Sequence, residues 1–325
     1  MALKIHKLTK KEAQKISNYY NLGKVISIKL FEEGLVNSNY KLTTEKGDFV
    51  IRFLGKEPDK WKKEMLELEK KVLFHLKKKK FPYKIPIPLR NKKKKYLSTI
   101  NKRYYWIYKM IPGEIEDLNE ARLKELAKAV ATYYKYIKDL KIKVKKEHFQ
   151  MGWFIEQYEV IEKKLAKIKN PNKTDQLMKD NFEFFKDLVH KLDKIDFKYN
   201  MIAAHGDIHK ANVLFKGDKL IGMIDFDNIK IAPRVEDLAY ALRLSTLGSR
   251  GLDKKGTNTF IKEYEKYVKL TKKEKSFIIP LIIRDNSIVF WWMYMEMKKG
   301  QDKKYDMIKW TIDSTKALVK DWEGK

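Results

Sequence analysis

The stretch Ala204–Asp227 reads A-H-G-D-I-H-K-A-N-V-L-F-K-G-D-K-L-I-G-M-I-D-F-D. Two short apolar runs within it, residues 212–215 and 220–226, flank the polar tetrapeptide at 216–219. Apolar runs on either side of a Gly-Asp turn are typical of a β-hairpin. The stretch therefore predicts a hairpin that follows a short polar loop.

Three polar side chains of this stretch are expected to lie close together. The hairpin would bring Asn212 and Asp225 to its open end, with Asp207 in the loop just before it. Mg²⁺ is held in proteins by one or two oxygen side chains together with substrate phosphates. A further carboxylate can orient a hydroxyl and accept its proton, and phosphoryl transfer requires this set of groups. A single Asp or Asn in a turn is usually structural, but the combined pattern favours a catalytic interpretation.

Length and composition set the class of protein. A chain of 325 residues can bury one or two domain cores. It has no cysteine, which excludes a disulfide framework and thiolate chemistry. No apolar run approaches the 18 residues of a membrane span, and the first residues lack the apolar core of a signal peptide. We therefore expect a cytoplasmic protein without a membrane-inserted segment.

The net charge of +29 invites a nucleic-acid partner. However, 64 of the basic residues are Lys and only 8 are Arg, and the lysines are spread over nearly every segment. Nucleic-acid readers depend on the guanidinium fork of Arg. We therefore interpret the excess charge as solvated surface and do not expect specific nucleic-acid binding.

The N-terminal third predicts an antiparallel sheet with one main helix. Thr9 and Glu12 form a capping-box pattern ahead of a first helix that ends near Tyr20. Asp59 is the expected N-cap of a longer helix with an apolar stripe. The strands alternate with turn signals. Expected helices are 10–20 and 60–78, and expected strands are 25–30, 39–43, 48–53, 96–100 and 103–110.

The remainder is predicted to be mainly helical apart from the central hairpin. Pro233 is expected at the first position of a helix, with Glu236 and Asp237 in its first turn. The other expected helices are 119–140, 153–168, 174–192, 256–270, 272–299 and 302–322.

The motif His205-Gly-Asp-x₄-Asn212, followed by Ile-Asp-Phe-Asp, resembles the catalytic loop and metal motif of the aminoglycoside phosphotransferase / type II homoserine kinase-like family. These are small-molecule kinases of protein-kinase-like fold. The resemblance implies an α+β bilobal fold. Residues 1–110 would form a small nucleotide-binding N-lobe with an antiparallel sheet and one main helix, and 111–325 a mostly helical C-lobe with the catalytic loop and substrate site.

The same resemblance implies ATP and Mg²⁺ as cofactors. It implies Asp207 as the catalytic base and Asn212 and Asp225 as the Mg²⁺ ligands. His205 and Asp237 would support the catalytic loop structurally, whereas the role of His209 stays open. The family often has His late in the 119–140 helix, where this chain has Tyr133-Tyr134.

Nucleotide-binding residues follow from the resemblance as well. Arg52 lies between apolar residues in its strand, so it is either a solvent-facing edge residue or a fork on the nucleotide phosphates. The resemblance favours the second alternative, with Glu69 as the paired helix carboxylate and Glu64 as a rival. The other expected nucleotide-binding residues are Asn37, Ser38, Lys109, Met110 and Ile111.

Two other function classes can be weighed against a small-molecule kinase. A protein kinase would need a long activation segment and an A-P-E motif, yet Glu236 follows Asp225 after only eleven positions. A catalytically silent nucleic-acid-binding or scaffold protein would suit the charge, but the intact Asp/Asn/Asp set argues against it.

The acceptor is open between several hydroxylated small molecules. Arg234, Arg243 and Arg284 follow the metal motif and could hold a carboxylate, with Asp227 available for an ammonium group. This favours a homoserine-like amino acid. The alternatives are an aminosugar or choline, for which Trp291, Trp292, Tyr294 and Glu296 could form an aromatic cage. The sequence does not identify the acceptor, the choice between ATP and GTP, or the oligomeric state.

Overall fold

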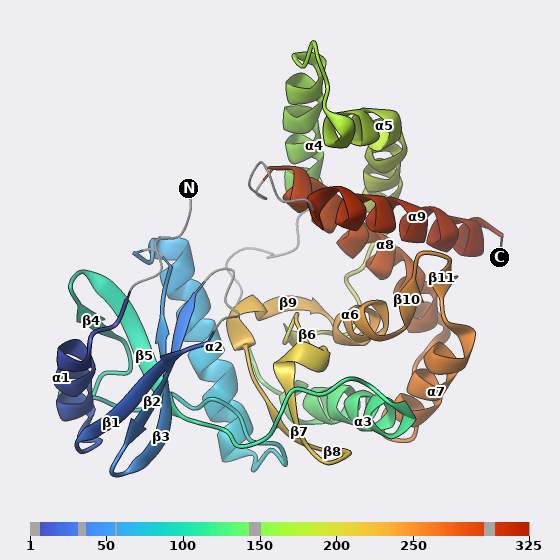
Figure 1. Ribbon diagram of the computed structural model, residues 1–325. Helices are drawn as coiled ribbons and strands as arrows, with labels where there is room; N and C mark the ends of the chain where they lie inside the picture. The colour runs from blue at the N-terminus through green and yellow to red at the C-terminus, as the bar shows by residue number, and fades with distance from the viewer. Residues whose placement is uncertain (1–6, 32–36, 56, 143–150, 296–302, 325) are drawn as a thin grey trace. The chain divides into compact units, whose positions relative to one another are not determined.

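The computed structural model describes residues 7–31, 37–55, 57–142, 151–295 and 303–324 (Figure 1). The chain divides into two compact units. The first unit comprises Met1–Glu114 with Ile221–Asp227, and the second comprises Ile115–Leu220 with Asn228–Lys325.

A five-stranded antiparallel sheet forms the centre of the first unit. Its order is β1-β2-β3-β5-β4, so β3 is the central strand. The predicted antiparallel sheet is thus confirmed. The strands are β1 Val25–Leu30, β2 Ser38–Thr44, β3 Gly47–Phe53, β4 Ser98–Ile100 and β5 Arg103–Lys109.

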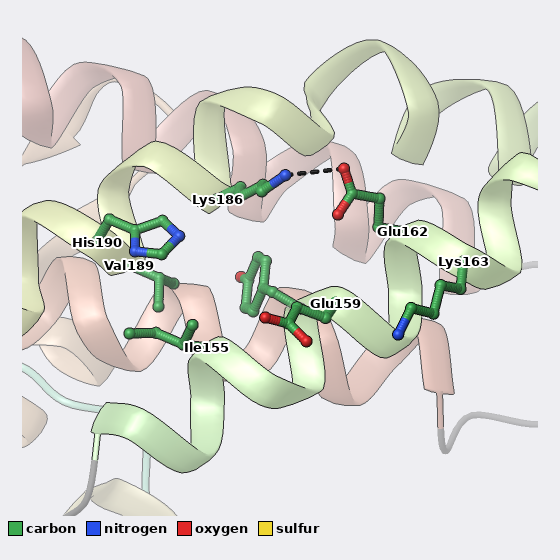
Figure 2. A pocket seen from close by; sticks show the side chains of 8 residues that line it. Ile155, Glu159, Glu162, Lys163, Lys186, Val189 and His190 are labelled. Carbon is green, nitrogen blue, oxygen red and sulfur yellow. Dashed lines mark hydrogen bonds and ion pairs between the residues drawn. The ribbon is translucent and has the colours of Figure 1, made fainter.

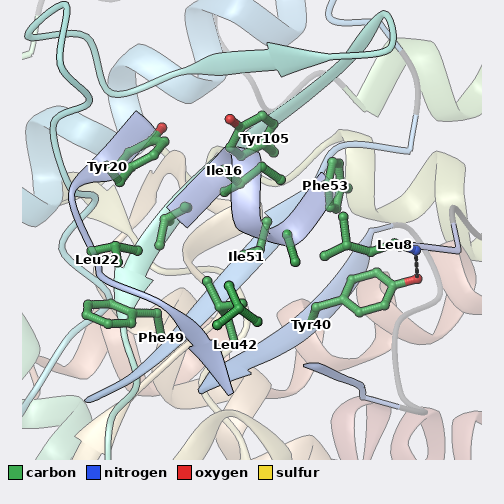
Figure 3. Close-up of a cluster of buried hydrophobic side chains, with 13 residues drawn as sticks. Leu8, Ile16, Tyr20, Leu22, Tyr40, Leu42, Phe49, Ile51, Phe53 and Tyr105 are labelled. Atoms are coloured by element: carbon green, nitrogen blue, oxygen red, sulfur yellow. Dashed lines mark hydrogen bonds between the residues drawn. The ribbon is translucent and has the colours of Figure 1, made fainter. Parts of the chain in front are cut away.

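Two helices, α1 Lys10–Tyr20 and α2 Lys60–Lys78, pack on this sheet. The predicted capping box of α1 is present, with Thr9 accepting from the Glu12 backbone and Glu12 accepting from Thr9. Figure 3 shows the apolar core between α1 and one face of the sheet, with Ile16 meeting Ile51 and Phe53. Successive strand residues face opposite sides, so Arg52 faces away from this core.

Residues 221–227 belong to the first unit, although we expected them in the C-lobe. Lys84 forms a parallel bridge with Gly222. Its N–H donates to the Ile221 carbonyl at 2.9 Å, and its carbonyl accepts from the Met223 N–H at 2.9 Å. These bonds attach the end of the central hairpin to the first unit, a pairing across more than 130 residues that no local pattern encodes.

The second unit is mainly helical, as predicted. Its short strands pair as β6 with β9, β7 with β8, and β10 with β11. The helices are α3 Glu120–Ile137, α4 Met151–Ala166, α5 Lys173–Asp193, α6 Val235–Thr246, α7 Lys254–Glu265, α8 Lys272–Met295 and α9 Lys303–Glu323. The strands are β6 Met201–Ala204, β7 Val213–Lys216, β8 Lys219–Met223, β9 Lys230–Pro233, β10 Leu247–Gly248 and β11 Gly251–Leu252. Residues 221–223 of β8 belong to the first unit.

The expected position of Pro233 at the start of a helix is wrong. Pro233 is the last residue of β9 and lies opposite Met201 of β6, and α6 begins two residues later at Val235. Proline lacks an N–H and is tolerated at the end of an edge strand. The β6–β9 pair was missed because both strands are short and lie far apart in the sequence.

A small hollow of about 230 Å³ lies between α4 and α5 (Figure 2). Glu162 of α4 and Lys186 of α5 form an ion pair of 2.8 Å at its edge. The hollow is lined by Ile155, Tyr158, Glu159, Glu162, Lys163, Lys186, Val189 and His190. None of the predicted site residues lines it.

Candidate active site

The predicted catalytic loop begins where β6 ends, and it turns at Gly206. This glycine has a φ of +77°, a conformation that a residue with a Cβ adopts only with strain. A Cβ at this position would lie closer than 3.0 Å to the carbonyl oxygen of Asn228. The glycine therefore allows the loop backbone to approach the segment that follows the metal motif.

Asp237, in the first turn of α6, holds the loop from behind. Its carboxylate accepts the backbone N–H groups of His205 at 3.0 Å and Gly206 at 2.7 Å. Burial raises the pKa of Asp237 to about 7, although these two hydrogen bonds lower it. The expected supporting residue is thus bonded directly to the loop backbone.

His205 is fully buried and lies against Tyr133 of α3. The two ring centroids are 5.9 Å apart in an edge arrangement. The Tyr133 hydroxyl donates to the Ala203 carbonyl at 2.9 Å. Tyr133 therefore supports strand β6, which leads into the predicted catalytic loop.

Asp207 is half-buried, and three side chains surround its carboxylate. Asn228 donates to Oδ2 at 3.0 Å, and the Nε2 of His209 lies 3.4 Å from Oδ1. Tyr240 of α6 forms a further side-chain hydrogen bond. Burial raises the pKa of Asp207, but the bonds from His209 and Tyr240 outweigh it, and the net pKa lies below the ordinary carboxyl value. Asp207 is therefore ionised at neutral pH.

Asn212 ends a 3₁₀ turn, Lys210–Asn212, directly after Asp207. Its Nδ2 donates to the Asp207 carbonyl at 3.0 Å and lies 3.1 Å from His209 Nε2. Within the described residues its carboxamide oxygen has no hydrogen bond. That oxygen is the atom type that a Mg²⁺ ligand must offer.

The second part of the motif belongs to the first unit. Asp225 is exposed and has a φ of +58°. A non-glycine residue in this left-handed region is uncommon, and such residues concentrate at functional sites. The charge of Asp225 also acts on Glu69 and Lys62 of α2, so the exposed carboxylate lies near the buried ion pair described next.

Arg52 lies in central strand β3 and is only 5% exposed, which rules out the solvent-facing alternative. Its Nη1 donates to Glu69 Oε1 at 2.9 Å, so Glu69 rather than Glu64 is the partner. The guanidinium also lies over the Trp106 ring, 5.2 Å from its centroid. Burial raises the pKa of Glu69, and the charge of Arg52 opposes this shift.

We expected Asp227 to bind the ammonium group of the acceptor, but its partners are side chains of the first unit. Its carboxylate forms an ion pair with Arg52 and accepts a hydrogen bond from Asn37 Nδ2. Ser38 begins the neighbouring strand β2. Asp227 therefore helps to fix the Arg52 guanidinium within the first unit.

The expectation that Arg234 and Arg284 hold the substrate is wrong. Both are buried and already neutralised by carboxylates. Arg234 forms a two-point ion pair with Glu274, with Nη2 at 2.6 Å from Oε2. Arg284, 1% exposed, pairs with Glu236 and Asp285. Buried guanidinium groups require such partners because desolvating a charge is costly.

Arg243 differs from these two arginines. It is 6% exposed, and its Nε donates to the Asn286 carboxamide oxygen at 2.7 Å. Within the described residues no carboxylate pairs with it. Arg243 therefore differs from Arg234 and Arg284 in having no carboxylate partner in this part of the chain.

Residues 27–267 match the sequence model of the phosphotransferase enzyme family. The chain belongs to this family. It is 23% identical over 271 residues to the homoserine kinase of Zymomonas mobilis subsp. mobilis, covering 81% of this chain and 79% of that protein. The chain is therefore a small-molecule phosphotransferase.

Solved structures of small-molecule kinases share the fold. A microcompartment-associated aminopropanol kinase matches with a TM-score of 0.72 and 14% identity, covering 97% of this chain and 98% of that one. Spectinomycin phosphotransferase APH(9)-Ia, in complex with ADP and spectinomycin, matches with a TM-score of 0.70 and 16% identity over 96% and 99% of the two chains. The predicted kinase-like α+β fold is confirmed.

Sequence reasoning missed two residues of this phosphotransferase that contact Asp207. Tyr240 follows Asp237 by three positions, so both lie on one face of α6. That spacing was a usable signal. Asn228 follows the Ile-Asp-Phe-Asp motif directly, but its bond to Asp207 depends on the close approach at Gly206, which the sequence does not reveal.

Proposed function

We propose that this phosphotransferase transfers the γ-phosphoryl group of ATP to the hydroxyl of a small, homoserine-like amino acid. The observation that carries the proposal is the environment of Asp207. Its carboxylate is ionised, and Asp237 holds its loop by accepting two backbone hydrogen bonds. A fixed carboxylate of this kind can orient an acceptor hydroxyl.

In the proposed reaction the acceptor oxygen forms a bond to the γ-phosphorus while the bond from that phosphorus to the ADP oxygen breaks. The hydroxyl proton passes to Asp207. Because its pKa is below the ordinary value, Asp207 is a weak base and mainly positions the hydroxyl. This suits a loose transition state, in which the nucleophile needs little activation.

Mg²⁺, when bound, would neutralise the charge on the phosphates. We propose that the Asn212 carboxamide oxygen and the Asp225 carboxylate hold it. Both offer hard oxygen atoms, and Mg²⁺ needs few protein ligands when phosphates supply the others. The described residues contain no group of three or more His, Cys, Asp or Glu that could hold a metal ion by itself.

We propose that Arg52, fixed by Glu69, contacts the nucleotide phosphates and that Asn37 and Ser38 lie in the phosphate-covering loop. The segment 109–111 is proposed to bind adenine. It lines a pocket of about 470 Å³ in the first unit. The Met110 N–H already donates to the Asp48 carbonyl at 2.9 Å, so other backbone groups of this segment would contact the base.

The choline alternative loses support from the position of Tyr294. The Nζ atoms of Lys164 and Lys304 lie 4.5 Å and 5.4 Å from its ring centroid. A ring that already faces two ammonium groups is a poor wall for a quaternary ammonium cage. Glu296, the expected acidic member of the cage, lies outside the described residues.

The test is ADP release with ATP and Mg²⁺ in the presence of homoserine, 3-aminopropan-1-ol, choline or an aminosugar. We expect turnover that is highest with homoserine and abolished or strongly reduced in Asp207→Asn. Turnover that prefers choline or an aminosugar would overturn the proposed acceptor. Absence of turnover with every hydroxylated acceptor would overturn the proposed reaction, and salt-sensitive binding of nucleic acid would then favour a binding protein.

No helix in the described part of the chain has the length and apolar character to cross a bilayer.

A further inference from the structure

One face of α6 carries both Tyr240, which contacts Asp207, and Arg243, which has no carboxylate partner within the described ranges. Tyr240 and Arg243 are three positions apart, so they are neighbours on the helix surface. Tyr240 hydrogen-bonds Asp207, and its ring lies 6.1 Å from that of His209. Arg243 therefore lies about one helical turn from Tyr240, the residue of α6 that contacts the proposed catalytic base.

Helix α8 meets this face with Asp285 and Asn286. Asn286 accepts the Nε–H of Arg243 at 2.7 Å and donates to Thr315 at 2.9 Å, so it fixes the guanidinium against α9. The neighbouring Asp285 is 6% exposed and binds Arg284 through one carboxylate oxygen, at 2.9 Å. Within the described residues its other oxygen has no hydrogen bond.

The charged groups near this face act on the Tyr240 hydroxyl. Burial is the main cause that raises the pKa of Tyr240; Asp207 and Asp285 raise it further, and Arg243 lowers it. Tyr240 is therefore surrounded by the base, an anion and a cation. No ion pair joins Arg243 and Asp285 in the described part of the chain.

Arg243 is buried without a carboxylate partner in the described part of the chain, and Asp285 is buried with one of its two carboxylate oxygens in the ion pair with Arg284. A buried charged group that keeps an unsatisfied polar atom is unfavourable. A molecule that carries both opposite charges would satisfy the two groups together. The guanidinium fork suits a carboxylate, and the free oxygen of Asp285 suits an ammonium group.

We propose that Arg243 binds the carboxylate and Asp285 the ammonium group of the acceptor, so that the enzyme selects a free hydroxylated α-amino acid. This inference rests on the proposed function and deepens it. An amino alcohol would leave Arg243 without a partner, and an aminosugar without a carboxylate would do the same. Arg243 and Asp285 thus determine specificity, whereas Asp207 handles the hydroxyl.

The test compares three acceptors on one enzyme preparation: homoserine, 3-aminopropan-1-ol, which lacks the carboxylate, and 4-hydroxybutanoate, which lacks the ammonium group. Ratios of kcat/KM for two acceptors do not depend on the folded fraction, so a partly unfolded variant still gives a valid result. We expect the wild-type enzyme to prefer homoserine over each analogue by about 10- to 100-fold, the effect of one charge-assisted bond.

Arg243→Met should remove the preference over 3-aminopropan-1-ol and keep the preference over 4-hydroxybutanoate. Asp285→Asn should do the reverse. Arg250→Met is the matched control, because Arg250 is an exposed arginine of the same unit, and its ratios should equal those of the wild type.

Unchanged ratios in Arg243→Met or Asp285→Asn would overturn the inference while kinase activity persists, as would a wild-type enzyme that does not distinguish the three acceptors. Loss of ADP release with every acceptor in the wild type would instead overturn the proposed function. The two failures are therefore distinguishable in one set of measurements.

Discussion

Replacing Gly206 with alanine should destabilise the enzyme more than replacing Gly217, although both glycines have a positive φ. Their φ values are +77° and +60°. An added Cβ at Gly217 meets nothing within 4 Å, whereas at Gly206 it lies 3.2 Å from the Asn228 carbonyl carbon and closer still to the oxygen. The Gly217→Ala variant therefore isolates the backbone effect, and the difference between the variants isolates the steric overlap.

The backbone effect of a left-handed alanine is about 1–2 kcal/mol. A smaller gain from the stiffer unfolded chain partly offsets it. Overpacking against a backbone atom adds about 1–3 kcal/mol. We therefore expect the free energy of unfolding to fall by about 1 kcal/mol in Gly217→Ala and by about 2–4 kcal/mol in Gly206→Ala. The overlap should also displace Asn228, which donates to Asp207 at 3.0 Å, and lower kcat about tenfold or more.

Urea unfolding measures the free energies of both variants, and ADP release gives their kcat values. Equal destabilisation of Gly206→Ala and Gly217→Ala, with wild-type kcat in both, would refute the close approach of the catalytic loop to Asn228. A loss of kcat in Gly206→Ala alone would support it.

Asp207→Asn should leave ATP binding by calorimetry nearly intact and lower kcat by about 10²–10⁴-fold; activity within a few-fold of wild type would remove Asp207 from its proposed role. Asp225→Ala should abolish activity and weaken the apparent Mg²⁺ affinity in a metal titration, because Mg²⁺ relies on few protein ligands, and an unchanged affinity would contradict the assignment. Arg52→Lys should raise the KM for ATP and lower kcat, since an ammonium group cannot hold Glu69 and a phosphate as a fork does; wild-type kinetics in Arg52→Ala would show that the guanidinium has no part in nucleotide binding. The raised pKa of Asp237, about 7, means that the folded protein keeps a proton which the unfolded chain releases above about pH 4. This contribution to stability is present at low pH and is lost as the pH rises toward 7, by up to about 1.4 kcal/mol per pH unit; urea unfolding of wild type and Asp237→Asn at pH 5 and pH 7 should show this dependence in the wild type only.

The sequence alone determined the elements whose signals lie within a few residues. The Thr9–Glu12 capping box places the start of α1, and the Asp59 cap places that of α2. Turn residues between apolar runs predict the hairpins, and the His-Gly-Asp and Ile-Asp-Phe-Asp motifs indicate the chemistry. These signals are local because a helix cap or a tight turn is formed by residues only a few positions apart in the chain.

Only the tertiary structure decided which buried groups become partners. Three arginines look alike in the sequence, yet Arg234 pairs with Glu274 forty residues away and Arg284 pairs with Glu236. Arg243 donates to the amide of Asn286 and has no carboxylate partner among the described residues. The ion-pair partner of a buried charge depends on which opposite charge lies close to it in the folded chain and on how far both are buried. The hydrophobic periodicity of the sequence reports neither this distance nor this burial. The same reason explains why Asp227, expected at the acceptor, instead pairs with Arg52.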